Sequence, residues 1–155
     1  MRVAGTIKPF DLNGANTGDK IPVGTLVYKV VVVDGGSKAI LTGVVTRPGI
    51  VTTDGARGKN RVRGLLVVSI DQWNYDDTEW SEKKQEYVGT KDAWLKRYTT
   101  ASSTVDGSRT DGEHGLNGIT YNVGEEVFVK KFDKTTRQCS KGIHVYLTRQ
   151  GAENH

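Results

Sequence analysis

Cysteine is almost absent from this chain. Cys139 is the one cysteine among 155 residues, so the chain closes no internal disulfide, as is typical of proteins in a reducing cytoplasm. A structural zinc site takes four ligands with short paired spacings, and a single cysteine is too few for one. We therefore expect a cytoplasmic protein that holds no metal.

Long apolar runs and signature motifs are missing as well. No stretch approaches the run of about 18 apolar residues that crosses a membrane. The opening MRVAGTIKPFDLNG has a basic residue but no apolar core, so we expect no secretory signal. There is no P-loop, no dinucleotide-binding glycine fingerprint and no Gly-x-Ser-x-Gly elbow. These absences predict no membrane partner and no cofactor, and they count against an enzyme.

Glycine, in contrast, is abundant. The chain holds 19 glycines with a hydrophobic content of 35%, which is typical of a turn-rich β protein rather than a helical one. The length fits one domain with a real core, but not two. We predict a single domain over residues 1–155, mainly β in an α+β arrangement, with an antiparallel sheet that is sandwich-like or rolled.

The β-branched runs predict where the strands lie. Residues 25–33 and 38–46 flank Asp34-Gly35-Gly36-Ser37, a short glycine linker that favours an antiparallel hairpin. Residues 30–33 are continuously apolar, so we expect both faces of that strand end to be covered. Further strands are expected at residues 61–70, 119–123, 126–129 and 143–147, with a short edge strand within residues 2–7.

Residues 71–104 differ in character and are predicted to be an insertion. They hold all three tryptophans and dense charge. Asp77 is placed to cap a short helix over residues 78–87, and residues 91–98 fit either a second short helix or a strand. Residues 99–118 are polar and glycine-rich, which predicts a mobile surface loop. Near the end, Thr148 is placed to cap a short helical turn.

The last third of the chain carries a family pattern. Its pieces are an aromatic strand turning at a glycine (residues 121–124), a Phe-Asp pair (132–133), Cys-x-x-Gly-Ile-His (139–144) and Thr-Arg-x-x-Ala-Glu-Asn (148–154). This pattern resembles an uncharacterised domain found behind pentapeptide repeats and as a free-standing protein of phages and giant viruses. Residues 26–29 and 58–61 resemble two further parts of the family pattern more weakly. The resemblance implies a kind of domain and a phage-type setting, but no agreed activity.

A basic glycine loop is the most suggestive functional feature. Arg57, Lys59, Arg61 and Arg63 lie within seven residues, in a chain of net charge +4. Glycines let backbone N–H groups approach an anion, and arginine binds phosphate oxygens bidentately. Side chains alternate along a strand, so Arg61 and Arg63 are expected to share one face. The alternative is a charged strand edge that only keeps the protein soluble.

Two other groups complete the candidate site. Trp73, from the insertion, is expected to stack a base beside the basic loop. His144 belongs to the Cys139 segment, which fits a buried structural cysteine and a backbone-bonded histidine, the lining of a pocket, or a thiol nucleophile with its base. We expect the paired carboxylates to be solvated surface residues rather than catalytic acid–base pairs. They lie at residues 76–77, 125–126, and 111 with 113.

Three functions are compatible with these features. The first is a non-enzymatic phage-type protein that sequesters an anionic, phosphate-bearing small molecule, foremost a nucleotide immune second messenger, and works as a homo-oligomer. The second is a nucleic-acid- or protein-binding accessory domain, for which a net charge of +4 is low. The third is an enzyme working through Cys139 and His144, which predicts a depressed thiol pKa.

Overall fold

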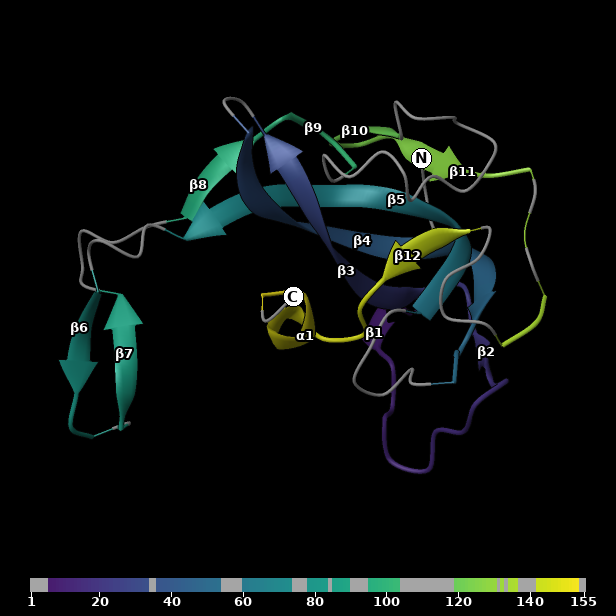
Figure 1. The fold of residues 1–155 in the computed structure, drawn as a ribbon, viewed down its shortest axis with the longest axis horizontal. Coiled ribbons are helices and arrows are strands. Elements are labelled where there is room, and N and C mark those ends of the chain that lie inside the picture. Colours follow the sequence, from purple (N-terminus) through teal and green to yellow (C-terminus); the bar gives the residue numbers. More distant parts are fainter. Residues whose placement is uncertain are drawn as a thin grey trace.

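The protein is mainly β, as its composition predicts. The computed structural model describes residues 6–33, 36–53, 60–73, 78–83, 85–89, 95–103, 119–130, 132, 134–136 and 142–153. These residues form one large sheet, a separate two-stranded sheet and a short helix near the C-terminus (Figure 1). The predicted fold class is confirmed, except for one helix that proves to be a hairpin.

The central hairpin joins β3 (Thr25–Val33) to β4 (Ser37–Ile50). The two strands pair antiparallel from Leu26 opposite Val44 to Val33 opposite Ser37. This confirms the hairpin expected from the two β-branched runs, although β4 continues beyond its predicted end at residue 46. Short edge strands flank it: β1 (Lys8–Pro9) runs parallel to β3, and β2 (Lys20–Ile21) runs antiparallel to β4.

The longest shared strand is β5 (Asn60–Trp73), which pairs with β4 along one edge. Its other edge is occupied by three strands in succession. From the start of β5 to its end these are β12 (Ile143–Val145), β11 (Glu126–Phe128) and β8 (Leu95–Tyr98). Segments that are distant in sequence therefore meet along β5, and its first half positions the candidate site.

The sheet rolls, because segments that pair with β5 continue to β3. After β8, the chain enters β9 (Thr100–Ser102), which pairs with β3 and with β10 (Thr120–Asn122). After β12, Tyr146 exchanges two backbone hydrogen bonds with Tyr28 of β3. The large sheet is open in its strand order, and these links curl it round its core.

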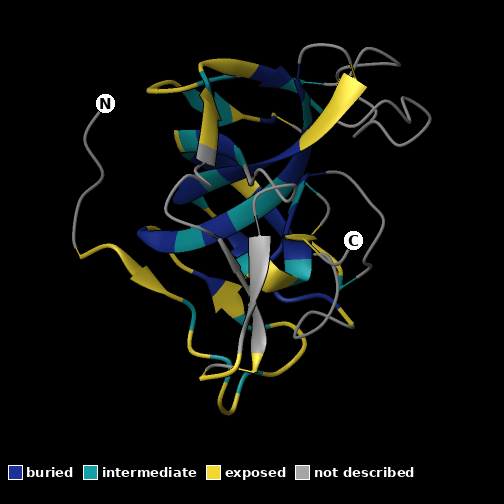
Figure 2. Ribbon diagram, turned by 90° about the vertical axis from the view of Figure 1, so that its left-hand side faces the viewer, coloured by how far each residue is buried: buried dark blue, intermediate teal, exposed yellow. Residues whose placement is uncertain are grey.

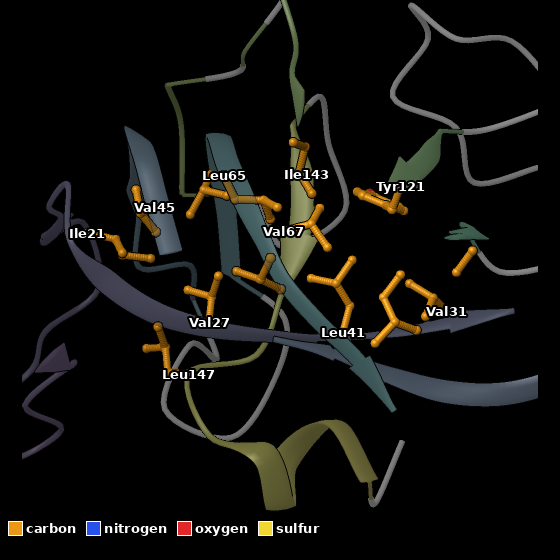
Figure 3. Packing of buried hydrophobic residues seen from close by; sticks show 14 of the residues in the cluster. Ile21, Val27, Val31, Leu41, Val45, Leu65, Val67, Tyr121, Ile143 and Leu147 are labelled. Atoms are coloured by element: carbon orange, nitrogen blue, oxygen red, sulfur yellow. The ribbon is translucent and has the colours of Figure 1, made fainter. Parts of the chain in front are cut away.

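The main core lies inside this roll. Figure 3 shows side chains from several strands pointing towards one another, among them Val27, Leu41, Leu65, Tyr121 and Ile143, all of which are buried. Figure 2 shows buried residues along the middle of the sheet and exposed residues at its edges and turns. The roll thus gives a mid-sized chain one continuous apolar interior.

A second, smaller core lies on the outer side of β3 and β4. Here Val30, Ile40, Tyr146 and Ala152 pack together beneath α1 (Arg149–Glu153), while Val31 and Val33 face the main core. Both faces of this end of β3 are covered, as its apolar run predicts. The Thr148 hydroxyl accepts a hydrogen bond from Gly151 N at 3.0 Å, which confirms the predicted cap. No helix in the described part of the chain is long and apolar enough to cross a membrane.

The prediction of a helix over residues 78–87 is wrong. The chain forms an antiparallel hairpin there, β6 (Thr78–Ser81) and β7 (Glu86–Gly89), with Trp80 opposite Tyr87. The turn between the strands places Gln85 at φ 54°, a left-handed conformation that a continuous helix excludes. Figure 1 shows this hairpin standing apart from the large sheet.

The predicted insertion and mobile loop overlap with the large sheet. Residues 95–98 are strand β8, which resolves the choice between helix and strand, and residues 100–102 are strand β9 within the segment expected to be loop. Both strands pair with the large sheet. Residues 104–118 of the expected loop, and residues 2–5 of the expected edge strand, lie outside the described residues.

Candidate functional site

The predicted site residues fall into three groups. Arg61, Arg63 and Trp73 all belong to β5, and His144 of β12 lies opposite Arg61 in the strand register. Arg57 and Lys59 lie outside the described residues. The structure therefore brings together the basic start of β5 and the histidine strand, and it leaves Trp73 at the far end of the same strand.

Arg61 is a buried residue. Its exposed fraction is 0%, and its Nη2 donates a hydrogen bond of 2.5 Å to the carbonyl oxygen of Thr135. Its Cζ lies 5.2 Å from the centroid of the Phe132 ring. The expectation that the Arg61 and Arg63 guanidinium groups project together from one sheet face or rim is therefore corrected: Phe132 and Thr135 lie against Arg61, which ties their segment to β5.

Arg63 lies exposed two residues further along β5. Its Nη2 is 3.5 Å from the carbonyl oxygen of Lys130, and its own carbonyl accepts a hydrogen bond from Val129 N. Lys130 is exposed as well. The pairing of β5 with the end of β11 thus brings the exposed Arg63 side chain to the backbone of Lys130, itself an exposed cation.

Trp73 does not lie near these cations. It lies ten residues further along β5 than Arg63, which is roughly 33 Å of strand at about 3.3 Å per residue. At that end, β5 pairs with β8, with Trp73 opposite Leu95. The expectation that Trp73 stacks a base beside the basic loop is not compatible with this separation.

His144 lies half-buried in β12, and its backbone is used structurally. Its carbonyl oxygen accepts a hydrogen bond of 2.9 Å from Lys29 Nζ of β3. Cys139 lies outside the described residues, so the suggested pairing of the two side chains has no geometry here. No group of three or more His, Cys, Asp or Glu residues is placed to hold a metal ion in the part of the chain that the structure describes.

Sequence reasoning missed a second feature beside Arg63, namely the Arg47–Phe128 stack. Arg47 Cζ of β4 lies 3.7 Å from the centroid of the Phe128 ring of β11, and Arg47 Nε lies 3.4 Å from Glu126 Oε2. Phe128 is 43% exposed, and the Arg47 side chain is 42% exposed. The stack therefore forms part of the surface of the sheet and not of its core.

Gly64 of β5 makes this stack possible. It lies between the two strands, opposite Arg47 on one side and Phe128 on the other. A Cβ at Gly64 would be 3.0 Å from both Arg47 Cγ and Phe128 Cβ, closer than side chains normally pack. The missing side chain thus lets the arginine stem cross β5 and reach the ring.

A β-bulge also contributes to the position of Arg47. Val45 pairs with Leu65 and Arg47 with Gly64, so Thr46 is an extra residue in β4. Residues i and i+2 of a regular strand point to the same face, yet Val45 is buried in the core and Arg47 is half exposed. The bulge redirects Arg47 to the outer face, as bulges commonly do beside functional sites. Sequence reasoning missed Arg47 because the strand was predicted to end at residue 46, whereas β4 continues to Ile50.

The root of the basic loop is held firmly beside this surface. Thr52 N donates a hydrogen bond of 3.0 Å to Asn60 Oδ1, and both residues are fully buried. Thr53 N donates to the carbonyl oxygen of Thr136, next to the residue that accepts from Arg61. The segment that carries Arg57 and Lys59 therefore begins and ends at the same fixed point at the start of β5.

A separate ion pair lies at the opposite end of β5. Arg149 of α1 contacts Asp71 Oδ1 at 2.5 Å and Glu153 Oε1 at 2.7 Å. Partial burial opposes the charge of Arg149, but the hydrogen bonds and attraction from Asp71 and Glu153 outweigh it and raise the pKa of the guanidinium. This pair holds the helix on the sheet and is distant from Arg63 along the strand.

Comparison with known proteins adds no relative. No family model matches the chain, and neither a curated protein nor a solved structure is significantly similar to it. The resemblance to the phage and pentapeptide-repeat-associated domain therefore stays a prediction, and function has to be argued from the surface around the first half of β5.

Proposed function

We propose that the protein is a non-enzymatic binding protein that sequesters a phosphate-bearing small molecule. The main support is that Arg63 and Lys130 are both exposed cations, with Arg63 Nη2 3.5 Å from the Lys130 carbonyl oxygen. Lys130 also follows Phe128 of the Arg47–Phe128 stack by two residues. Guanidinium and ammonium groups are the side chains that bind phosphate oxygens most strongly. Arg57 and Lys59 belong to a loop rooted at the start of the same strand.

A nucleotide is the foremost ligand of this class, because it offers both a phosphate and an aromatic base. The phage-type resemblance favours a nucleotide immune second messenger held unaltered, and the sequence lacks the signature motifs of common nucleotide-processing enzymes. The carboxylate of Glu126 contacts Arg47 and is therefore engaged in positioning that arginine. A homo-oligomer is the assembly proposed for such a protein.

The second candidate is an accessory domain that binds nucleic acid or protein. It is favoured by the same exposed cations, which would contact a phosphate backbone as readily as a single nucleotide. Binding of this kind weakens steeply with salt, because several condensed counterions are released at once. An oligonucleotide arm in the binding experiment distinguishes this candidate from the first.

A thermal-shift screen tests the proposal. The panel consists of cyclic di- and trinucleotides, ADP-ribose derivatives and short oligonucleotides. A ligand at a hundred times its Kd stabilises the protein by about 2.7 kcal/mol, which raises Tm by several degrees. Recovery of the ligand intact supports sequestration, a cleaved product supports an enzyme, and a shift with oligonucleotides alone supports the second candidate.

Charge reversal locates the site. Arg63→Glu with Lys130→Glu is expected to abolish the shift. The matched control is Lys96→Glu with Arg97→Glu, which makes the same charge change at two exposed residues of β8, at the far end of β5. Equal loss in both double variants would mean that only net charge matters and would contradict a site at Arg63 and Lys130.

A further inference from the structure

We propose that the Arg47–Phe128 stack is the surface on which an aromatic base of the ligand stacks. This inference rests on the proposed binding of a phosphate-bearing ligand and states how its other half is held. The stack combines a planar guanidinium and an aromatic ring 3.7 Å apart. Bases stack on both kinds of group in nucleic-acid and nucleotide sites.

The stack is formed by specific structural features. Three separate features place Arg47 over Phe128: the extra residue at Thr46, the missing side chain at Gly64 and the contact of Arg47 Nε with Glu126. The Glu126 side chain is 17% exposed, so it holds the guanidinium from below the surface rather than from solvent. A guanidinium fixed in this way loses little further entropy when a flat ligand stacks on it.

The surface remains open to a ligand. Phe128 is the one exposed aromatic residue among the large hydrophobic side chains of the described chain, and it keeps its exposure although Arg47 covers part of it. A large apolar side chain left in water is costly unless a partner covers it. An aromatic base is flat enough to cover the stack without displacing Arg47.

The cations lie at a suitable reach from the stack. Arg63 directly precedes Gly64, and Lys130 follows Phe128 by two residues, which span at most roughly 7 Å of extended chain. By alternation along the strands, Lys130 lies on the same face as Phe128. Arg63 starts on the opposite face from Gly64 and extends its Nη2 to 3.5 Å from the Lys130 carbonyl oxygen. A base on the stack and a phosphate at Lys130 therefore fit within one nucleoside phosphate, with Arg63 as the second cation. The geometry fits a single nucleotide unit and needs no longer polymer.

The test compares two probes that differ only in the base. AMP and ribose 5-phosphate are titrated into the isotope-labelled protein, and binding is followed by NMR, which detects weak affinities. We expect AMP to bind about ten-fold more tightly, a modest value for stacking one base. AMP, but not ribose 5-phosphate, is expected to shift the Arg47 Nε–H signal through the ring current of the base.

Two variants separate stacking from charge. Phe128→Leu is expected to reduce the preference for AMP to within about two-fold, a loss of roughly one stacking contact. Arg47→Lys keeps the charge and is also expected to lose the preference, because lysine has no planar group. Val68→Ala, which alters another exposed apolar residue of β5, serves as the control and should leave the preference unchanged.

The outcomes distinguish this inference from the proposed function. A preference for AMP that persists in Phe128→Leu, shown to be folded by its spectrum, overturns base stacking at this stack while phosphate binding stands. Loss of both probes in Arg63→Glu with Lys130→Glu supports the phosphate half. If the wild-type protein binds neither probe, nor any nucleotide in the thermal-shift panel, the proposed function fails and this inference fails with it.

Discussion

At the scale of single residues, neighbouring arginines of one strand have opposite roles. Arg61 is wholly buried and donates to the Thr135 carbonyl, whereas Arg63 two residues later is exposed. Side chains alternate along a strand, so Arg61 and Arg63 start from the same face of β5. The difference in their exposure therefore comes from the residues that cover them. The Phe132 ring and the Thr135 carbonyl lie against the Arg61 guanidinium, whereas the Arg63 guanidinium lies 3.5 Å from the Lys130 carbonyl oxygen at the surface.

Replacing these two arginines should therefore give unequal losses of stability. Arg61→Ala removes a buried side chain and leaves the Thr135 carbonyl without this donor, so we expect the free energy of unfolding to fall by about 3 kcal/mol. Arg63→Ala changes a surface position and should cost no more than about 0.5 kcal/mol. Urea unfolding measures both, and equal losses would show that Arg61 does not tie the covering segment to β5.

Tyr146 should make the fold sensitive to alkaline pH. Burial raises the pKa of its hydroxyl, because the ionised form is poorly solvated in the small core beneath α1. The neutral hydroxyl fits the fold, so this contribution is fully present below the unfolded pKa of 10.0 and is lost as pH rises through the higher folded value.

Comparison of wild type and Tyr146→Phe measures this effect. Unfolding by urea between pH 8 and pH 11 should show a steeper loss of stability above about pH 10 in the wild type, since the variant has nothing to ionise at this position. The remaining tyrosines are common to both proteins and cancel in the difference. Parallel curves would refute the assignment to Tyr146.

At the scale of elements, local pattern predicted the strands better than the helices. The β3–β4 hairpin, the strand at the start of β5 and the cap at Thr148 all follow from neighbouring residues: β-branched runs, a glycine linker and a hydroxyl before a helical turn. For residues 78–87 the helix was predicted from the position of Asp77 as a cap, although the segment also contains residues that favour strands. In the structure these residues form a hairpin in which Trp80 pairs with Tyr87, a pair of residue types that favour strands.

The helix α1 should depend on Asp71 more than on its own sequence. Five residues are too few for an independent helix, so tertiary contacts must hold it. Asp71 is nearly buried, whereas the contact between Arg149 and Glu153 lies at the surface. In double-mutant cycles with alanine, we expect a coupling of about 1–2 kcal/mol between Asp71 and Arg149 but no more than about 0.5 kcal/mol between Arg149 and Glu153. Equal couplings would contradict the dominant role of Asp71.

At the scale of the whole molecule, the candidate site is built from segments that sequence alone does not bring together. Arg47 comes from β4, Arg63 and Gly64 from β5, and Phe128 from β11. The basic cluster is visible in the sequence because its four cationic residues lie within seven positions, which is why Arg63 was predicted. The Arg47–Phe128 stack depends on strand register and on one bulge, and neither can be read from composition or spacing.

The two sheets should differ in how readily they open. β6 and β7 form a two-stranded sheet of their own, and such hairpins are marginal in water, whereas β4 is paired on both edges. Hydrogen exchange followed by mass spectrometry should show amides of the hairpin exchanging about 100-fold or more faster than those of β4. Similar protection in both would mean that the hairpin is stabilised by something beyond its own two strands.

The order of the strands along β5 has a consequence for synthesis on the ribosome. β5 ends at Trp73, but the strand that covers its first residues, β12, begins only at Ile143. A nascent chain therefore carries an unpaired edge at Arg61 and Val62 for the seconds that translation takes to reach β12. Open edges invite pairing with other chains, and the positive charges clustered at this edge would repel a second copy during that interval.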